Sequence, residues 1–89
     1  MNDKVSVALD ENFDKIEEFA IINGFMILSS LRNIRSTGII ELKTLGYKYD
    51  INAFLSALHS ALGFKISNVD VVKEGTYYTI NISDYKEIV

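Results

Sequence analysis

The sequence contains no cysteine, no proline and no tryptophan, and it has a single histidine, His59. Without cysteine, the chain can form no disulfide bond, no thiolate metal site and no thiol nucleophile. One histidine leaves too few soft ligands for a conventional zinc site, so we expect no metal and no cofactor. The five glycines are isolated from one another, which excludes a glycine-rich loop of the kind that cradles phosphates.

Long apolar runs are also missing. No run is longer than that from Phe25 to Leu28, which is far too short to cross a bilayer. The first residues, Met1 to Lys4, are polar and are not followed by the apolar run of a secretory signal. These absences predict a cytoplasmic protein that does not bind membranes.

What remains is the composition of an ordinary folded domain. The chain has 89 residues, of which 48% are hydrophobic and 24% are charged. This length fits one domain with a core large enough to fold alone, so residues 1–89 are predicted to form a single α/β domain. We expect residues 83–89 to be a loose tail.

The net charge of −3 is unevenly distributed along the chain. Residues 1–18 sum to −4, whereas the remaining residues sum to +1. The most basic stretch holds four cations opposed only by Glu41; they are Arg32, Arg35, Lys43 and Lys48. This distribution fits ordinary solvated faces, and it also fits one acidic face and one modestly basic face on the same domain.

The N-terminal half shows two different hydrophobic periods. Over Val5–Leu9, large apolar residues alternate with Ser6 and Ala8, which predicts a short strand. The acidic segment Asp10–Asn12 has good N-cap chemistry, and a helical period runs from Phe13 to Ile34. Gly24 lies inside that period, and the sequence leaves open whether it allows close packing or breaks the segment into two helices.

The next part of the chain alternates a strand with the clearest helix of the sequence. A mostly buried strand is predicted over Ile39–Leu45, with Glu41 and Lys43 pointing away from the core. Asp50 is predicted to cap an amphipathic helix that ends before Gly63, where a left-handed cap is typical.

The last part of the chain predicts a β-hairpin. Its strands are Ile66–Val72 and Tyr77–Ile82, and Lys73–Gly75 forms the tight turn between them. The element order is therefore β-α-β-α-β-β. Because strands separated by helices favour at least one right-handed parallel crossover, we predict an α+β fold of two layers. One layer is a mixed four-stranded sheet, and the other consists of two helices on one face of it.

Residues for catalysis are scarce. Asp10, Glu11 and Asp14 lie at a predicted helix start, where carboxylates stabilise the helix in any case. His59 lies off the apolar stripe of its helix, with no identifiable nucleophile or orienting carboxylate. The loop Gly46–Asp50 precedes a helix N-terminus and could hold an anion, although it equally suits an ordinary turn. The sequence therefore predicts no enzyme, with a small-molecule-binding or enzymatic module as a further alternative.

Tyrosines and cations interleave in one loop, where Tyr47 and Tyr49 flank Lys48. Aromatic side chains next to cations can stack bases and neutralise phosphates. The two tyrosines can equally cover the edge of a small core. The candidates for nucleic-acid binding are Arg32, Arg35, Lys43, Tyr47, Lys48 and Tyr49.

From Thr37 onward the chain resembles the Alba superfamily of small archaeal chromatin and RNA-binding proteins. The resemblance is carried by the strand Ile39–Gly46, the helix Asp50–Leu62, the strand start Lys65–Ile66 and the closing hairpin. It implies an Alba-like domain that dimerises through its second helix and last strands. The residues on those faces are Phe54, Leu58, Ala61, Tyr77 and Tyr78. On this basis, Phe54→Glu is expected to yield monomers.

The chain also differs from the Alba pattern at three places. The acidic segment Asp10–Asn12 stands where Alba proteins have a lysine pair, and Lys73–Gly75 replaces a long basic hairpin arm. Tyr47 stands where an arginine usually follows the glycine. The residues that match are Lys43, Gly46 and Lys48.

These observations predict a dimeric Alba-like interaction domain in a nucleic-acid-associated complex. Its partner would be a second copy or, in a heterodimer, a basic paralogue. The alternative is weak, non-sequence-specific binding of DNA or RNA by the basic edge. Such binding relies on several phosphate contacts, and the chain offers only three or four clustered cations.

Overall fold

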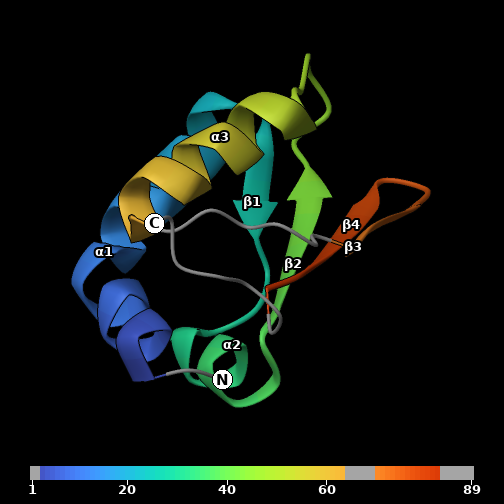
Figure 1. The fold of residues 1–89 in the computed structure, drawn as a ribbon. Coiled ribbons are helices and arrows are strands. Elements are labelled where there is room, and N and C mark those ends of the chain that lie inside the picture. The colour runs from blue at the N-terminus through green and yellow to red at the C-terminus, as the bar shows by residue number, and fades with distance from the viewer. Residues whose placement is uncertain (1–2, 64–69, 83–89) are drawn as a thin grey trace.

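The computed structural model describes residues 3–63 and 70–82, which form a layer of helices against one sheet (Figure 1). The helices are α1 (Asp3–Ile22), α2 (Leu31–Thr37) and α3 (Ile51–Leu62). The strands are β1 (Phe25–Ile27), β2 (Ile39–Thr44), β3 (Asp70–Glu74) and β4 (Tyr77–Asn81). The order is thus α-β-α-β-α-β-β, and the predicted order β-α-β-α-β-β is wrong. The expected tail 83–89 and the strand start Lys65–Ile66 lie outside the described residues.

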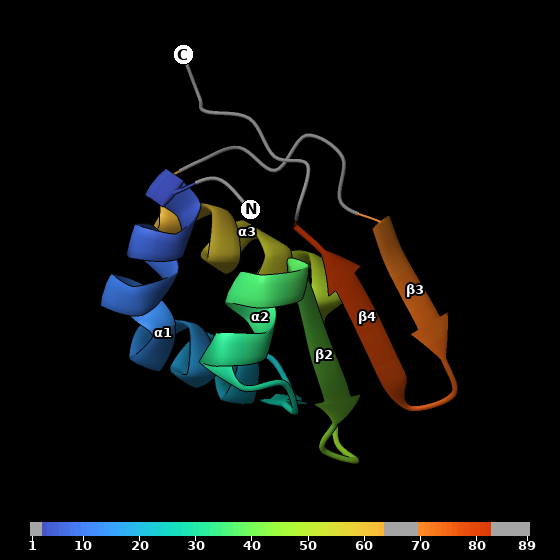
Figure 2. The same ribbon diagram turned by 90° about the horizontal axis from the view of Figure 1, so that it is seen from below.

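The four strands lie in the order β1-β2-β4-β3, and every neighbouring pair is antiparallel. Figure 2 shows β2, β4 and β3 side by side. The α+β class and the four-stranded sheet are confirmed, whereas the predicted mixed sheet is wrong. A parallel crossover is present, because α3 connects β2 to β3 and both of these strands are antiparallel to β4. Strand β4 lies between them, so no two neighbouring strands are parallel.

The segment Val5–Leu9 belongs to helix α1 and is not a strand. Val5 and Leu9 are buried, whereas Val7 is half exposed. Residues four apart share a face in a strand and also in a helix, so five residues do not separate the two periods. Because the segment is helical, Val5 and Leu9 share one buried face of α1 with Ile16 and Ala20.

Gly24 breaks the long helical period, and the chain continues as a strand and then a short helix. Its φ of +87° lies in the left-handed region that favours glycine. A Cβ atom there would lie 2.6 Å from the carbonyl oxygen of Lys48 and 2.8 Å from the Cα of Tyr49. The backbone N–H of Asp50 also donates to the carbonyl of Asn23 at 3.1 Å. Gly24 therefore provides both the break and the close packing that the sequence left as alternatives.

The helix and the closing hairpin predicted in the second half are confirmed, but the predicted turn Lys73–Gly75 is wrong in its position. Lys73 and Glu74 belong to β3, and the turn consists of Gly75 and Thr76. The Asp50 carboxylate accepts a hydrogen bond from the backbone N–H of Ala53 at 3.1 Å, which caps α3. Gly63 ends α3 with a φ of +71°. Gly75 opens a two-residue turn between β3 and β4 with a φ of +62°, as a type II′ hairpin requires.

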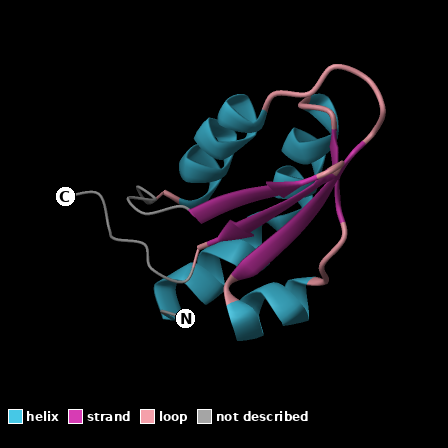
Figure 3. Ribbon diagram, turned by 90° about the vertical axis from the view of Figure 1, so that its right-hand side faces the viewer, coloured by secondary structure: helices cyan, strands magenta, loops and turns pink. Residues whose placement is uncertain are grey.

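The core lies on one face of the sheet, and all three helices contribute to it, where two were predicted. Figure 3 separates the strands from the helices by colour. Helix α1 packs against α3, α2 and β1. The fully buried large side chains are Val5, Leu9, Ile16, Phe25, Ile34, Ile40, Leu42, Phe54, Leu58, Ile80 and Ile82. This packing leaves the other face of the sheet without a covering helix among the described elements.

Candidate interaction surface

The uncovered face of the sheet is built by the alternate residues of each strand. Along β2, Ile40 and Leu42 point into the core, so Glu41 and Lys43 point outward, as predicted. Along β4, Tyr78 and Ile80 point inward, which leaves Tyr77 on the outer side. We call this outer side the open face. Its side chains are Met26, Leu28, Ile39, Glu41, Lys43, Leu45, Val72, Glu74, Tyr77, Thr79 and Asn81.

The strand register arranges the open face in rows that run across the strands. The first row consists of Met26, Lys43, Tyr77 and Glu74, each paired with the next. In the second row, Glu41 pairs with Thr79 and Thr79 pairs with Val72. The backbone N–H of Leu28 donates to the carbonyl of Glu41 at 2.8 Å, which adds Leu28 to this second row. The open face therefore has two charges of opposite sign on β2, two apolar side chains beside them at the edge formed by β1, and one charged and one apolar side chain on the opposite edge strand β3.

Large apolar side chains are accessible to solvent on the open face. Met26 is 44% exposed, Tyr77 is 50% exposed and Val72 is 58% exposed. The Lys43 ammonium lies 5.9 Å from the centre of the Tyr77 ring, a cation–π distance. Grouped apolar surface on one side of a small domain marks an interaction surface, because scattered single residues alone would need no explanation.

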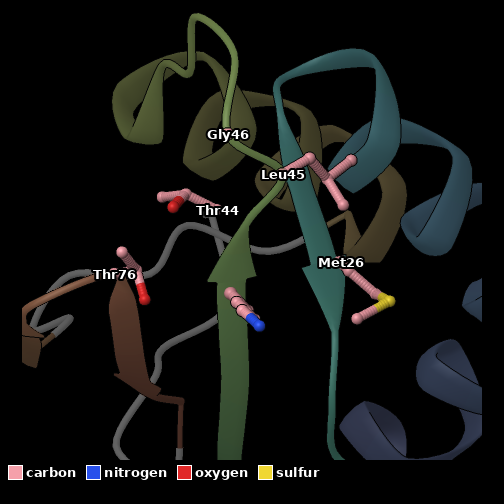
Figure 4. A pocket seen from close by; sticks show the side chains of 6 residues that line it. Met26, Thr44, Leu45, Gly46 and Thr76 are labelled. Atoms are coloured by element: carbon pink, nitrogen blue, oxygen red, sulfur yellow. The ribbon is translucent and has the colours of Figure 1, made fainter.

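On the described part of the open face, a shallow depression lies at each end of β2. The first is lined by Met26, Lys43, Thr44, Leu45, Gly46 and Thr76, and Figure 4 shows Met26 and Thr76 on opposite sides of β2. The second is lined by Leu28, Ser29, Asn33, Thr37, Ile39 and Glu41. Each depression holds a single charged side chain, so neither has the paired groups that acid–base catalysis needs.

The predicted basic edge is divided between the two ends of β2. Figure 1 places α2, which carries Arg32 and Arg35, at one end of β2 and the loop with Lys48 at the other. The two arginines line a third shallow depression together with Ser6 and Ser36. Arg35 Nη1 lies 3.2 Å from Asp10 Oδ1, so the acidic helix α1 partly neutralises this end. The structure therefore does not bring the six nucleic-acid candidates together.

The two loop tyrosines have different roles. The Tyr47 hydroxyl donates to the carbonyl of Ile21 at 3.2 Å, while its ring stays largely exposed. The Tyr49 ring packs over the core edge, 5.6 Å from the ring centre of Phe25 and 6.0 Å from that of Tyr78. The alternative that these tyrosines cover the edge of the core thus describes Tyr49.

Lys73 joins the edge strand β3 to this aromatic group. Its ammonium donates to the Tyr49 hydroxyl at 3.1 Å and lies within 5.8 Å of the centres of both the Tyr49 and Tyr78 rings. The hydrogen bond to Lys73 lowers the pKa of Tyr49, and the same contact raises the pKa of Lys73. Burial raises the pKa of Tyr78. This contact is a structural clamp, because Lys73 closes the end of the aromatic cluster.

Most residues expected at a dimer interface lie inside the chain's own core. Phe54 and Leu58 are fully buried, and Tyr78 is 6% exposed. Ala61 is half-buried against the core, and only Tyr77 is well exposed. A charge introduced by Phe54→Glu would therefore enter the core, so this variant is expected to unfold rather than form folded monomers. Dimer formation stays a prediction, and the open face is the surface available for it.

Met26, Val72 and Lys73 belong to the site or its support, and the sequence interpretation did not single them out. Met26 was assigned to a helix, because the helical period predicted from Phe13 to Ile34 includes the residues that form strand β1. The usable signal was the position of Gly24 directly before an apolar run of strand length.

Comparison of the chain with protein-family models, with curated proteins and with solved structures finds no match. Within residues 3–63 and 70–82, no helix has the length and apolar character needed to cross a membrane. In the same part of the chain, no group of three or more metal-ligating side chains could hold a metal ion.

Proposed function

We propose that this chain is a small protein-interaction domain that binds its partner through the open face of its sheet. The observation that supports the proposal is the exposure of Met26, Tyr77 and Val72 on neighbouring rows of one uncovered face. Apolar and aromatic side chains around a few charges are typical of the centre of a protein interface. The proposal keeps the dimeric, Alba-like interaction domain expected from the sequence, but it places the contact on the sheet instead of on α3.

The charges of the open face favour a protein partner over a nucleic acid. Lys43 is accompanied on this face by Glu41 and Glu74, so the surface has no cationic excess. Duplex DNA is bound through several simultaneous contacts to phosphates, each of which needs a cation. The divided arginines and lysines do not supply such a group.

Site-directed photo-cross-linking tests this proposal. A photoreactive phenylalanine analogue is placed at position 77, on the open face, in the cells from which the sequence comes. The matched control carries the analogue at position 7, where Val7 is equally exposed but lies on α1. We expect a discrete cross-linked protein from position 77 and none from position 7. Equal cross-linking from both positions, or none from position 77, would overturn the proposal.

A salt titration separates this function from the nucleic-acid alternative. Labelled duplex DNA and RNA are titrated with the protein at several salt concentrations. We expect no saturable binding at physiological salt. Binding that weakens steeply with salt and is lost in the double variant Lys43→Ala and Lys48→Ala would favour the nucleic-acid function instead.

A further inference from the structure

We infer that the partner on the open face is a second copy of this chain, packed sheet against sheet around a twofold axis over Leu42. This inference rests on the proposed function, since it names the partner for the same surface. A twofold interface is self-complementary: the residue that precedes the axis in one protomer meets the residue that follows it in the other. The open-face residues on either side of Leu42 must therefore be complementary to each other.

On strand β2, the two residues beside Leu42 have opposite charges. Glu41 and Lys43 flank Leu42 on the open face, one on each side. An axis that lies between the two sheets and runs perpendicular to β2 places Lys43 of one protomer opposite the partner's Glu41, and the reverse pair forms at the same time. Within the described part of the chain, neither side chain has an ion-pair partner of its own. Two equivalent ion pairs at the centre would fix the register of the two sheets.

The same axis pairs apolar with apolar further out. On β2, Ile39 and Leu45 are three residues before and after Leu42, so each would face the other's copy. On β1, Met26 lies in the row of Lys43 and Leu28 lies in the row of Glu41. The axis therefore sets Met26 against the partner's Leu28. Burial of these side chains supplies the attraction, and the charges supply the specificity.

On strands β4 and β3, the residues that the axis would bring together are less complementary. Tyr77 would face the partner's Thr79 across β4. On the edge strand β3, Glu74 would face the partner's Val72, which is not a complementary pair. Packed sheets cross at roughly 30°, so strands far from the axis separate from their counterparts. The contact is thus centred on β1, β2 and β4.

Charge reversal tests this arrangement, because the two ion pairs respond in opposite ways to single and combined changes. Light scattering and sedimentation are measured over a range of protein concentrations, and circular dichroism checks the fold of each variant. The wild type is expected to have twice the chain mass of 10.0 kDa. In Lys43→Glu, and separately in Glu41→Lys, like charges face each other twice. Each variant should raise the dimer dissociation constant roughly 10- to 100-fold.

An equimolar mixture of the two single variants gives the decisive result. In a mixed dimer, one chain would carry carboxylates at both positions 41 and 43, and the other would carry ammonium groups at both. Every carboxylate would then face an ammonium group, so we expect the mixture to dimerise as tightly as the wild type, although each component alone dimerises more weakly. The chain with both reversals, Lys43→Glu with Glu41→Lys, restores the original pairing and should dimerise alone.

Two charge reversals away from the open face serve as controls. Arg32→Glu on α2 and Glu11→Lys on α1 change the net charge by the same amounts as the two test variants but lie off the open face. Both controls should leave the dimer intact, because neither position meets the partner in the twofold arrangement.

A wild type that stays monomeric, a single variant that dimerises like the wild type, or a mixture that stays monomeric overturns the inference. Cross-linking from position 77 distinguishes this failure from failure of the proposed function. An adduct of twice the chain mass agrees with the second copy. An adduct with a different protein overturns the inference and leaves the proposed function standing, whereas the absence of any adduct overturns both.

Discussion

The two faces of one sheet differ completely in this molecule, although neighbouring residues of the same strands build them. Leu42 is fully buried, and the residues beside it, Glu41 and Lys43, are exposed. The inner face is covered by α1, α2 and α3, whereas no described helix covers the outer face. The inner face therefore accounts for folding, and the outer face is available for a partner. Variants on the two faces should therefore have separable effects.

The largest effect is expected from Phe54→Ala on the inner side. Phe54 is fully buried and its ring centre lies 6.1 Å from that of Phe25. Its removal should lower the free energy of unfolding by about 3–5 kcal/mol, because the cavity adds to the lost burial. The control Tyr77→Ala on the open face should cost less than about 1 kcal/mol. Urea unfolding of dilute protein measures both, and equal losses would contradict the division between the faces.

A smaller loss is expected from Gly24→Ala, which tests the break that creates β1. An added Cβ would meet backbone atoms of Lys48 and Tyr49 in a left-handed conformation. We expect a loss of about 2–3 kcal/mol. The control is Gly63→Ala, where φ is also positive but nothing lies within 4 Å of the added atom, so only about 1 kcal/mol should be lost. Similar losses at the two glycines would mean that the contact with the loop contributes nothing.

An alkaline titration tests whether the contact between Lys73 and Tyr49 holds the inner side together. The pKa of Tyr49 is lowered from 10.0, so its phenolate adds stability that is fully present above pH 10.0 and lost as the pH falls through the lowered pKa. The pKa of Lys73 is raised from 10.5, so its share is present below pH 10.5 and lost as the pH rises through the raised pKa. The charged contact is therefore strongest between the two folded-state pKa values.

Phenolate absorbance measures this titration directly. Tyr49→Phe should remove the earliest phenolate transition, and Lys73→Met should move that transition to higher pH. Lys43→Met, which removes a lysine from the open face, should leave it in place. An unchanged early transition in Lys73→Met would exclude the clamp.

The smallest effect is expected from Arg35→Ala at the end of α2. The ion pair of Arg35 with Asp10 is open to solvent, with side chains 46% and 42% exposed. Such a pair contributes less than about 1 kcal/mol, and salt weakens it further. Arg32→Ala is the control on the same helix. Thermal unfolding at low and high salt should show a small, salt-sensitive difference between the two variants, and a large one would mean that this end of the fold depends on its charges.

The elements predicted correctly are those whose start and end signals agree with their period. Asp50 and Gly63 bound α3, and the alternation of Tyr77–Ile82 predicts which residues of β4 face the core. The errors fall where a short pattern fits two periods. Val5 and Leu9 share a face in a strand and in a helix, and the apolar residues of β1 continue the period of the preceding helix. The open face was only half predicted, because Glu41 and Lys43 were assigned outward while Met26 was placed in a helix.

Helix α3, the closing hairpin and the inward and outward sides of β2 could be predicted from local sequence alone, because caps, turns and alternation are local properties of the chain. The tertiary structure decided that β1 lies beside β2 and that Tyr49 packs on Gly24. It also decided that all three helices share one face of the sheet. These features depend on contacts between residues far apart in the chain. The open face exists because all three helices pack on the other face of the sheet. A strand pattern shows that a residue points outward, but it does not show whether another element covers that residue.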